Sequence, residues 1–183
     1  MPSFPHRYYH EDMNYAFRIT FRKGDLFRTI AIDMETSLYD LALLLMSSLV
    51  DKEDLDTYSF FLQFGEDSYL TRKDEQESLF GYSTTHYHIL DDESFHNVIV
   101  RKADSGSFQI VDRGKQDNLV LDMEVGEMIP SPDKMEARLV DGSGVLEKDY
   151  RIKEMAFSAI LKNIERNLPL LKKAFRYRRP KTN

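Results

Sequence analysis

The sequence contains no cysteine and no tryptophan. Without a thiol, the protein cannot form a disulfide bond, use a thiolate nucleophile or bind zinc through cysteine. Long apolar runs are also missing, because the longest largely apolar run, from Leu41 to Val50, is far shorter than the ~20 residues of a membrane-spanning helix. The first residues, MPSFPHRYYHED, lack the apolar core of a secretory signal. We therefore expect a cytoplasmic protein with no membrane contact.

Charge is distributed unevenly along the 183 residues, which carry a net charge of −6. Residues 150–183 hold ten Lys and Arg side chains and two Glu side chains, a local balance of +8. Residues 1–149 therefore carry −14, which is −6 minus 8. Two interpretations stay open. The basic segment packs on the acidic body of its own chain, or it contacts nucleic acid.

The stretch from Phe17 to Val50 predicts a strand, a turn, a second strand and a helix. Apolar residues from Tyr15 to Phe21 alternate with smaller or polar ones, which is the period of a half-buried strand. The sequence KGD at 23–25 is typical of a turn, and residues 27–32 repeat the strand pattern, so the two strands form a hairpin. Ser37 predicts a helix N-cap, because leucines at three- and four-residue spacing follow it.

Further strands are predicted along the rest of the chain. The expected segments are 58–64, 84–90, 108–112, 119–125 and 135–140, with a hairpin around 115–118 and a polar surface loop over 66–78. From Tyr150 the apolar residues recur with the period of a helix. Pro169 lies within that pattern, and it either kinks one helix or begins a second one.

These elements predict the α+β class. The expected fold is a mixed, largely antiparallel sheet that opens with a hairpin and a helix, and that carries a long C-terminal helix. The expected organisation is a loosely ordered lead-in over 1–13, an α+β domain over 14–149, and a C-terminal helical segment with a basic tail over 150–183.

Three stretches resemble the plasmid ORF-three-like family, whose members are also described as passenger proteins of an insertion element. FRTIAIDMETSLYDLALLLMSSLV resembles the family's strand and its (S/T)LxDLHxxI helix. DKEDLDTYSFFL resembles the acidic link and strand that follow, and FQIVDRGKQDNLVLDMEVGEMIP resembles a later hairpin that ends at a proline. The likeness covers residues 15–135 and leaves the C-terminal helix outside.

The chain departs from this family at two places. Ala42 stands where typical members have histidine, and Asp112-Arg113-Gly114-Lys115 keeps only the Asp and Gly of the family's hairpin motif. The sequence is similar to a divergent branch of the family from Bacteroides-like bacteria. The resemblance implies an α+β fold, a bacterial cytoplasmic setting and a mobile-element history. It assigns no activity and gives no residue a role.

Five histidines are the candidates for a metal site. His86 and His88 would share one face of a strand, His6 and His10 one face of a helix, and His96 could join either pair. Zinc requires three or four ligands with supporting contacts, so these pairs predict surface or half-buried imidazoles rather than a site. We expect no metal and no cofactor.

The carboxylate runs at 66–67 and 91–93 would need burial to act as general acids or bases, and they lie in polar loops. No G-x-S-x-G elbow, phosphate-binding loop or EF-hand loop is present. No catalytic residue is therefore assigned.

The basic tail is the candidate nucleic-acid contact, because aromatic and cationic side chains alternate there as they do where single-stranded bases stack. The residues are Lys172, Lys173, Arg176, Tyr177, Arg178, Arg179 and Lys181. With Arg151, Lys153, Lys162 and Arg166 they are expected to form one basic face.

The preferred hypothesis is a non-enzymatic interaction or accessory protein that meets a protein partner through its acidic surface. The alternatives are a nucleic-acid-binding accessory factor that uses the basic tail, and an unrecognised hydrolase or metal-dependent enzyme.

Overall fold

The first hairpin of the computed structural model forms as the sequence predicts. β1 (Tyr15–Lys23) and β2 (Leu26–Asp33) pair antiparallel across a turn in which Gly24 has a φ of 58°. Glycine adopts that conformation at little cost. Phe17 and Ile19, on the apolar face of β1, are 2% and 0% exposed, so the alternation along this strand does separate a core face from an outer face.

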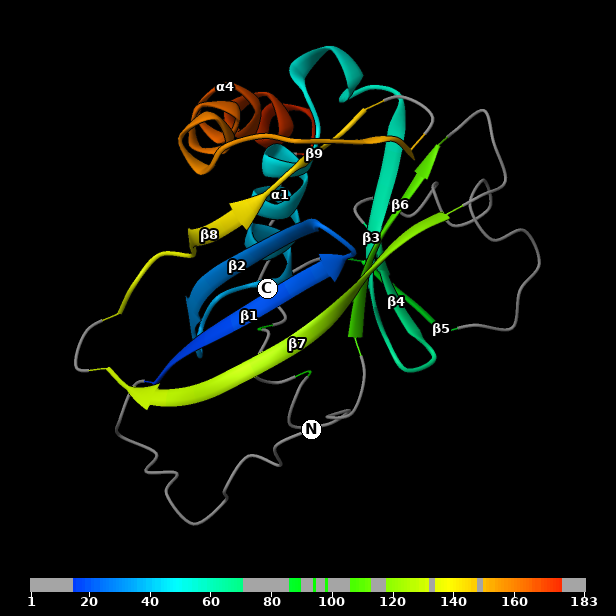
Figure 1. Cartoon of the computed structure of the whole chain (residues 1–183). Coiled ribbons are helices and arrows are strands. Elements are labelled where there is room, and N and C mark those ends of the chain that lie inside the picture. The colour runs from blue at the N-terminus through cyan, green and yellow to red at the C-terminus, as the bar shows by residue number, and fades with distance from the viewer. Residues whose placement is uncertain are drawn as a thin grey trace.

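The hairpin belongs to an eight-stranded sheet and has further strands on both sides (Figure 1). The structure describes residues 15–70, 86–89, 94, 98, 106–112, 118–131, 134–147 and 150–175. The strand order is β5-β4-β3-β6-β7-β1-β2-β8, and among these described strands only the β4–β5 pair is parallel. The remaining elements are α1 (Leu38–Leu49), the 3₁₀ helix η2 (Lys52–Asp54), β3 (Tyr58–Phe64), β4 (Asp67–Leu70), β5 (His86–Ile89), β6 (Gly106–Asp112), β7 (Asn118–Pro130), β8 (Arg138–Ser143), β9 (Val145–Leu146), β10 (Ile152–Lys153) and α4 (Phe157–Ala174).

The long strand β7 joins the two halves of the sheet. Residues 118–122 pair with β6, and residues 122–130 pair with β1. In Figure 1 β3 and β6 run steeply, whereas β1, β2 and β7 run obliquely, so the sheet twists strongly at β7. The predicted β6–β7 hairpin and the buried strand β3 are confirmed.

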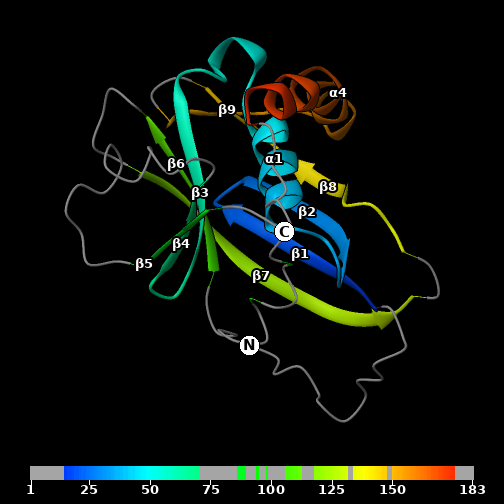
Figure 2. The same ribbon diagram turned by 180° about the vertical axis from the view of Figure 1, so that it is seen from behind.

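One helix, α1, covers a face of the sheet, and the other, α4, packs against α1 and the edge strand β8. α1 lies behind β1 and β2 in Figure 1 and in front of them in Figure 2, and α4 crosses one end of α1 in both views. Ten of the twelve residues of α1 are buried, because the sheet contacts one side of this helix and α4 contacts another. The α+β class and the C-terminal helix are thus confirmed.

The predicted polar loop over 66–78 was wrong in its first part. Residues 67–70 form β4, which pairs with β3 after a tight turn at Gly65, where φ is 60°. Asp67 and Tyr69 are 5% and 2% exposed. The polar composition concealed this strand, because pairing with β3 supplies the backbone partners that the sequence pattern does not show.

The C-terminal helix begins at Phe157 rather than near Tyr150, because residues 152–153 pair with β9 in a small second ladder. Pro169 lies inside one continuous helix, so it does not begin a second one. Its side chain is exposed, and at the solvent side water can replace the helical hydrogen bond that proline cannot make.

The buried face of α4 also differs from the predicted apolar row. Ile160 and Leu171 are buried as expected, but Leu161 is 39% exposed. Asn163 and Asn167 are buried in its place, at 1% and 0% exposure.

Within the described residues, no helix is long and apolar enough to cross a membrane.

Candidate functional site

A cleft of about 410 Å³ opens where the start of α1, the segment 134–137 and the last turns of α4 meet. We call it the acidic cleft. Four of its lining residues are carboxylates and two are lysines, a formal balance of −2. Leu44, Ala137 and Leu168 supply apolar surface. The lining residues are Asp33, Glu35, Thr36, Asp40, Leu44, Lys134, Met135, Glu136, Ala137, Leu168 and Lys172.

Asp33, at the end of β2, organises this cleft. One carboxylate oxygen, Oδ1, accepts hydrogen bonds from the Glu35 backbone N–H at 2.9 Å and from the Thr36 hydroxyl at 3.3 Å. The other, Oδ2, accepts from the Met135 backbone N–H at 3.0 Å. Asp33 is only 4% exposed, so this carboxylate fixes the walls of the cleft and is already engaged.

Three other carboxylates, those of Glu35, Asp40 and Glu136, belong to exposed residues of the acidic cleft. Glu35 pairs with Lys134, with 2.7 Å between the Lys134 ammonium and the carboxylate. The hydrogen bond and charge of Glu35 raise the pKa of Lys134, which is therefore a firm cation at neutral pH. Both side chains stay largely solvated, and such exposed ion pairs are weak. Replacing Lys134 by another cationic group at Glu35 would therefore cost little free energy.

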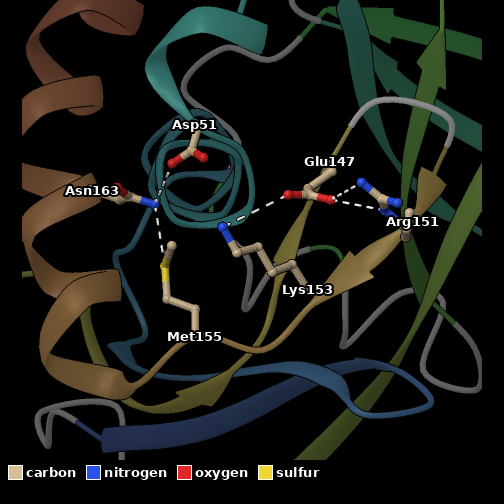
Figure 3. Close-up of polar contacts among 6 residues, drawn as sticks. All are labelled: Asp51, Glu147, Arg151, Lys153, Met155 and Asn163. Carbon is tan, nitrogen blue, oxygen red and sulfur yellow. Dashed lines mark hydrogen bonds and ion pairs between the residues drawn. The ribbon is translucent and has the colours of Figure 1, made fainter.

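A second cleft, of about 500 Å³, lies on the other side of α4 and is lined by both charge signs. Asn163 donates from its amide nitrogen to Asp51 Oδ1 at 3.3 Å and to the Met155 sulfur at 3.5 Å (Figure 3). The guanidinium of Arg166 donates to the amide oxygen of Asn163. These groups are satisfied by one another, so the arrangement joins α4 to the residue that follows the C-cap of α1 and to the segment between β10 and α4.

Beside this cleft, Glu147 contacts Arg151 and Lys153, two cations that were expected on a basic face. Its Oε2 accepts from Arg151 Nε at 2.9 Å, and its Oε1 lies 3.9 Å from the Lys153 ammonium (Figure 3). Lys162 and Arg166 line the second cleft together with Asp51 and Glu165. Of the expected basic face, Arg151 and Lys153 therefore pair with a carboxylate, and Lys162 and Arg166 share a cleft with two carboxylates.

Of the candidate nucleic-acid contacts, Lys172 and Lys173 lie in the last turn of α4 and are exposed. Lys172 lines the acidic cleft. The others, Arg176, Tyr177, Arg178, Arg179 and Lys181, lie outside the described residues.

The histidine candidates gain no described site. His86 and His88 belong to β5, where they pair in register with Asp67 and Tyr69 of β4. Their side chains lie outside the described part of the structure. His6, His10 and His96 lie outside the described residues altogether. The described residues contain no group of three or more His, Asp or Glu side chains that could hold a metal ion.

A buried and extensively hydrogen-bonded side chain, that of Arg28 in β2, was not anticipated from the sequence. It is 0% exposed, and burial lowers its pKa to about 10, so it still carries a positive charge at neutral pH. Its guanidinium donates to Ser48 Oγ at 3.0 Å, to the Ser48 carbonyl at 2.6 Å and to the Gly144 carbonyl at 2.6 Å. Two further bonds reach the carbonyls of Phe27 and Ser143 at 2.7 and 3.0 Å.

A signal for Arg28 was available in the sequence, because it occupies a core-facing register position between Leu26 and Ile30. An arginine at such a position requires buried acceptors. The sequence pattern alone could not identify which backbone carbonyls would accept the hydrogen bonds of Arg28.

Comparison with known proteins adds no function. No protein-family model matches the sequence, and no curated protein matches it. The chain is similar to a crystal structure of a protein of unknown function from Methanosarcina mazei Go1, with 12% sequence identity, coverage of 90% of this chain and 85% of that chain, and a TM-score of 0.48. A likeness at this score carries no argument about what the chain does.

Proposed function

We propose that the protein is a non-enzymatic interaction protein of the bacterial cytoplasm, and that the acidic cleft receives a basic segment of a partner protein. The observation that carries the proposal is the lining of the cleft, where exposed carboxylates and apolar side chains occur together. Lysine and arginine side chains fit such a surface, because their apolar stems pack on hydrophobic groups while their charged ends reach acceptors.

The size of the acidic cleft also suits a peptide. About 410 Å³ is at the small end of the range for ligand sites, enough for a few side chains of an extended segment. Asp33 holds both walls through backbone hydrogen bonds, so the cleft exists before a partner arrives. A preformed site avoids part of the ordering cost of binding.

Membership of the plasmid ORF-three-like family is part of this proposal and rests on the three sequence stretches quoted above. The nucleic-acid alternative rests on the positive charge of residues 150–183. Arg151 and Lys153 of that segment pair with Glu147, and Lys162, Arg166 and Lys172 line clefts that also contain carboxylates, which favours the protein partner. The enzyme alternative has no described group of residues in its support.

The test uses full-length protein and an array of twelve-residue peptides that differ in Lys and Arg content, with fluorescence anisotropy for each positive peptide. We expect binding to basic peptides with an apolar residue beside the cations, and weaker binding at high salt. The variant Glu35→Gln/Asp40→Asn/Glu136→Gln should lose this binding. The matched control Glu53→Gln/Asp122→Asn/Glu124→Gln removes the same charge at exposed positions outside the cleft and should retain it.

Equal loss of peptide binding in both variants would show a nonspecific charge effect and reject the cleft as the site. Single-stranded DNA and RNA of similar length are included as probes. Tighter, steeply salt-dependent binding to those probes would favour the nucleic-acid alternative instead.

A further inference from the structure

We propose that the acidic cleft is also a docking site for the basic tail of the same chain, residues 176–183, which competes there with the partner. This inference rests on the proposed function, because it describes how that site is regulated.

The end of α4 is fixed close to residues that line the cleft. The Phe175 ring packs edge-on against Phe60, with 5.4 Å between the ring centroids. The Phe175 carbonyl accepts a hydrogen bond from the Tyr39 hydroxyl, and its N–H donates to the Leu171 carbonyl at 2.8 Å. Tyr39 precedes Asp40, which lines the cleft. The tail therefore leaves α4 from an anchored residue.

The Tyr39 hydroxyl is protonated at physiological pH and can donate this hydrogen bond. Burial, and then the charge of Asp40, raise the pKa of Tyr39, so its hydroxyl keeps the proton that it donates to Phe175. Leu168 and Lys172, in the turns of α4 before Phe175, line the cleft themselves. The last turns of the helix thus lead along one wall of the cleft.

The tail is complementary to the cleft in charge and sufficient in length. Its sequence RYRRPKTN contains three arginines, one lysine and no acidic side chain, whereas the cleft has a formal balance of −2. Eight fully extended residues span about 26–29 Å, enough to enter a cleft that begins within the last turns of α4. Tethering gives such a segment an effective concentration on the order of 1 mM.

Competition follows from this tether. If the isolated tail binds the cleft with a Kd of about 0.1 mM, a tethered tail at about 1 mM weakens binding of another basic segment about 10-fold. A partner that binds the cleft must therefore have enough affinity to offset this roughly 10-fold loss. Alternatively, a modification that removes positive charge from the tail would release the tail from the cleft.

The test is carbodiimide cross-linking of the full-length protein, with mass spectrometry of the peptides. Carbodiimide joins a lysine amine to a carboxylate in contact with it, and Lys181 supplies the amine of the tail. We expect cross-links from Lys181 to Glu35, Asp40 or Glu136, and their loss in 1 M salt. A mixture of ¹⁵N-labelled and unlabelled protein separates links within one chain from links between chains.

Two results of this experiment would overturn the docking proposal. One is that Lys181 links only to carboxylates outside the cleft, such as Asp122 or Glu124, or to none. The other is that its cleft links join labelled to unlabelled chains, which would mean that the tail binds a second copy.

A second measurement tests competition and separates the two proposals. Full-length Arg176→Gln/Arg178→Gln/Arg179→Gln/Lys181→Gln should bind the basic array peptides about 10-fold more tightly than the wild type. Equal affinity of both forms would reject the docking proposal and leave the proposed function intact. Cleft cross-links from Lys181 in a protein that binds no array peptide in either form would instead support docking and reject the proposed function.

Discussion

The two ends of α1 are closed in different ways. At its first turn the Ser37 hydroxyl accepts a hydrogen bond from the Asp40 N–H at 3.0 Å, three residues along the chain. At its last turn there is no basic residue and no glycine, and Val50 continues in an extended conformation. Backbone carbonyls at that end accept hydrogen bonds from side chains that are distant in the sequence.

Two donors carry out this distant capping. Arg28 reaches the Ser48 carbonyl from β2, and Asn167 reaches the carbonyls of Ser47 and Val50 from α4 at 3.0 and 2.8 Å. The charge of Arg28 also lies favourably at the negative end of the helix dipole. A buried helix end can thus rely on tertiary partners, and the stability of that end depends on the packing of the whole domain.

The largest expected effect comes from Arg28→Met. The carbonyls of Ser48, Ser143 and Gly144 would lose their donors in a buried site, and each unsatisfied group costs about 1–3 kcal/mol. We expect a loss of about 3–5 kcal/mol in the free energy of unfolding, measured by urea denaturation.

The matched control for Arg28 is Arg22→Met, since Arg22 lies one register position away on the outer face and is exposed. Its guanidinium stands 4.4 Å from the centre of the Phe27 ring, a contact of about 0.5–1 kcal/mol at exposed sites. Similar losses in the two variants would contradict the capping role of Arg28.

Asn167→Ala should have the next largest effect, because it leaves the carbonyls of Ser47 and Val50 without the amide donor. We expect a loss of about 1–3 kcal/mol by urea denaturation. Glu165→Ala, at an exposed position of the same helix, is the control and should change stability by about 0.5 kcal/mol or less.

Asn167→Asp sharpens this test through pH. A buried carboxylate that faces carbonyl oxygens has its pKa raised above its unfolded value. The penalty relative to the wild type is therefore present above the folded pKa and is relieved as the pH falls through it. Urea denaturation of both proteins between pH 7 and pH 5 should show the difference narrowing. A constant difference would indicate that Asn167 acts only by filling space.

Ser37→Ala tests the local end of α1. Loss of an N-cap hydroxyl costs about 1 kcal/mol, and Ser37→Asp should retain most of the stability because aspartate also caps helices. Thermal or urea unfolding of both variants measures the effect. A loss in Ser37→Asp as large as that in Ser37→Ala would show that the hydroxyl acts through some other contact.

The smallest effect is expected for Lys134→Ala, since the Lys134–Glu35 pair near the start of α1 is exposed. The raised pKa of Lys134 means that any stabilisation is present at neutral pH and is lost as the pH rises through that pKa. At pH 7 we expect a urea midpoint close to that of the wild type at both low and high salt. A clear shift at low salt alone would show that the pair contributes more than its exposure suggests.

Elements held by local interactions were the ones that could be predicted. Alternation identified β1, and the serine before a leucine pattern identified the start of α1. The strand β4 was missed because its polar residues become buried only after pairing with β3. The buried asparagines of α4 were missed because an apolar pattern contains no information about the polar groups that a helix will face.

The acidic cleft could be anticipated only as a general acidic surface. Its lining residues come from the end of β2, the start of α1, the segment 134–137 and the last turns of α4. The sequence did show that a basic tail follows an acidic body. It could not show that Lys172 and Leu168 line the same cleft as Glu35 and Asp40.

By itself, the sequence determined the α+β class, the first hairpin and the capped start of α1, because these depend on residues within a few positions of one another. Only the tertiary structure decided how α1 ends, which polar side chains are buried and where a cleft forms. Arg28 and Gly144 are 116 positions apart, and Asn167 and Ser47 are 120 apart. Residue spacing cannot encode contacts over such separations, since they exist only once the sheet and both helices have packed.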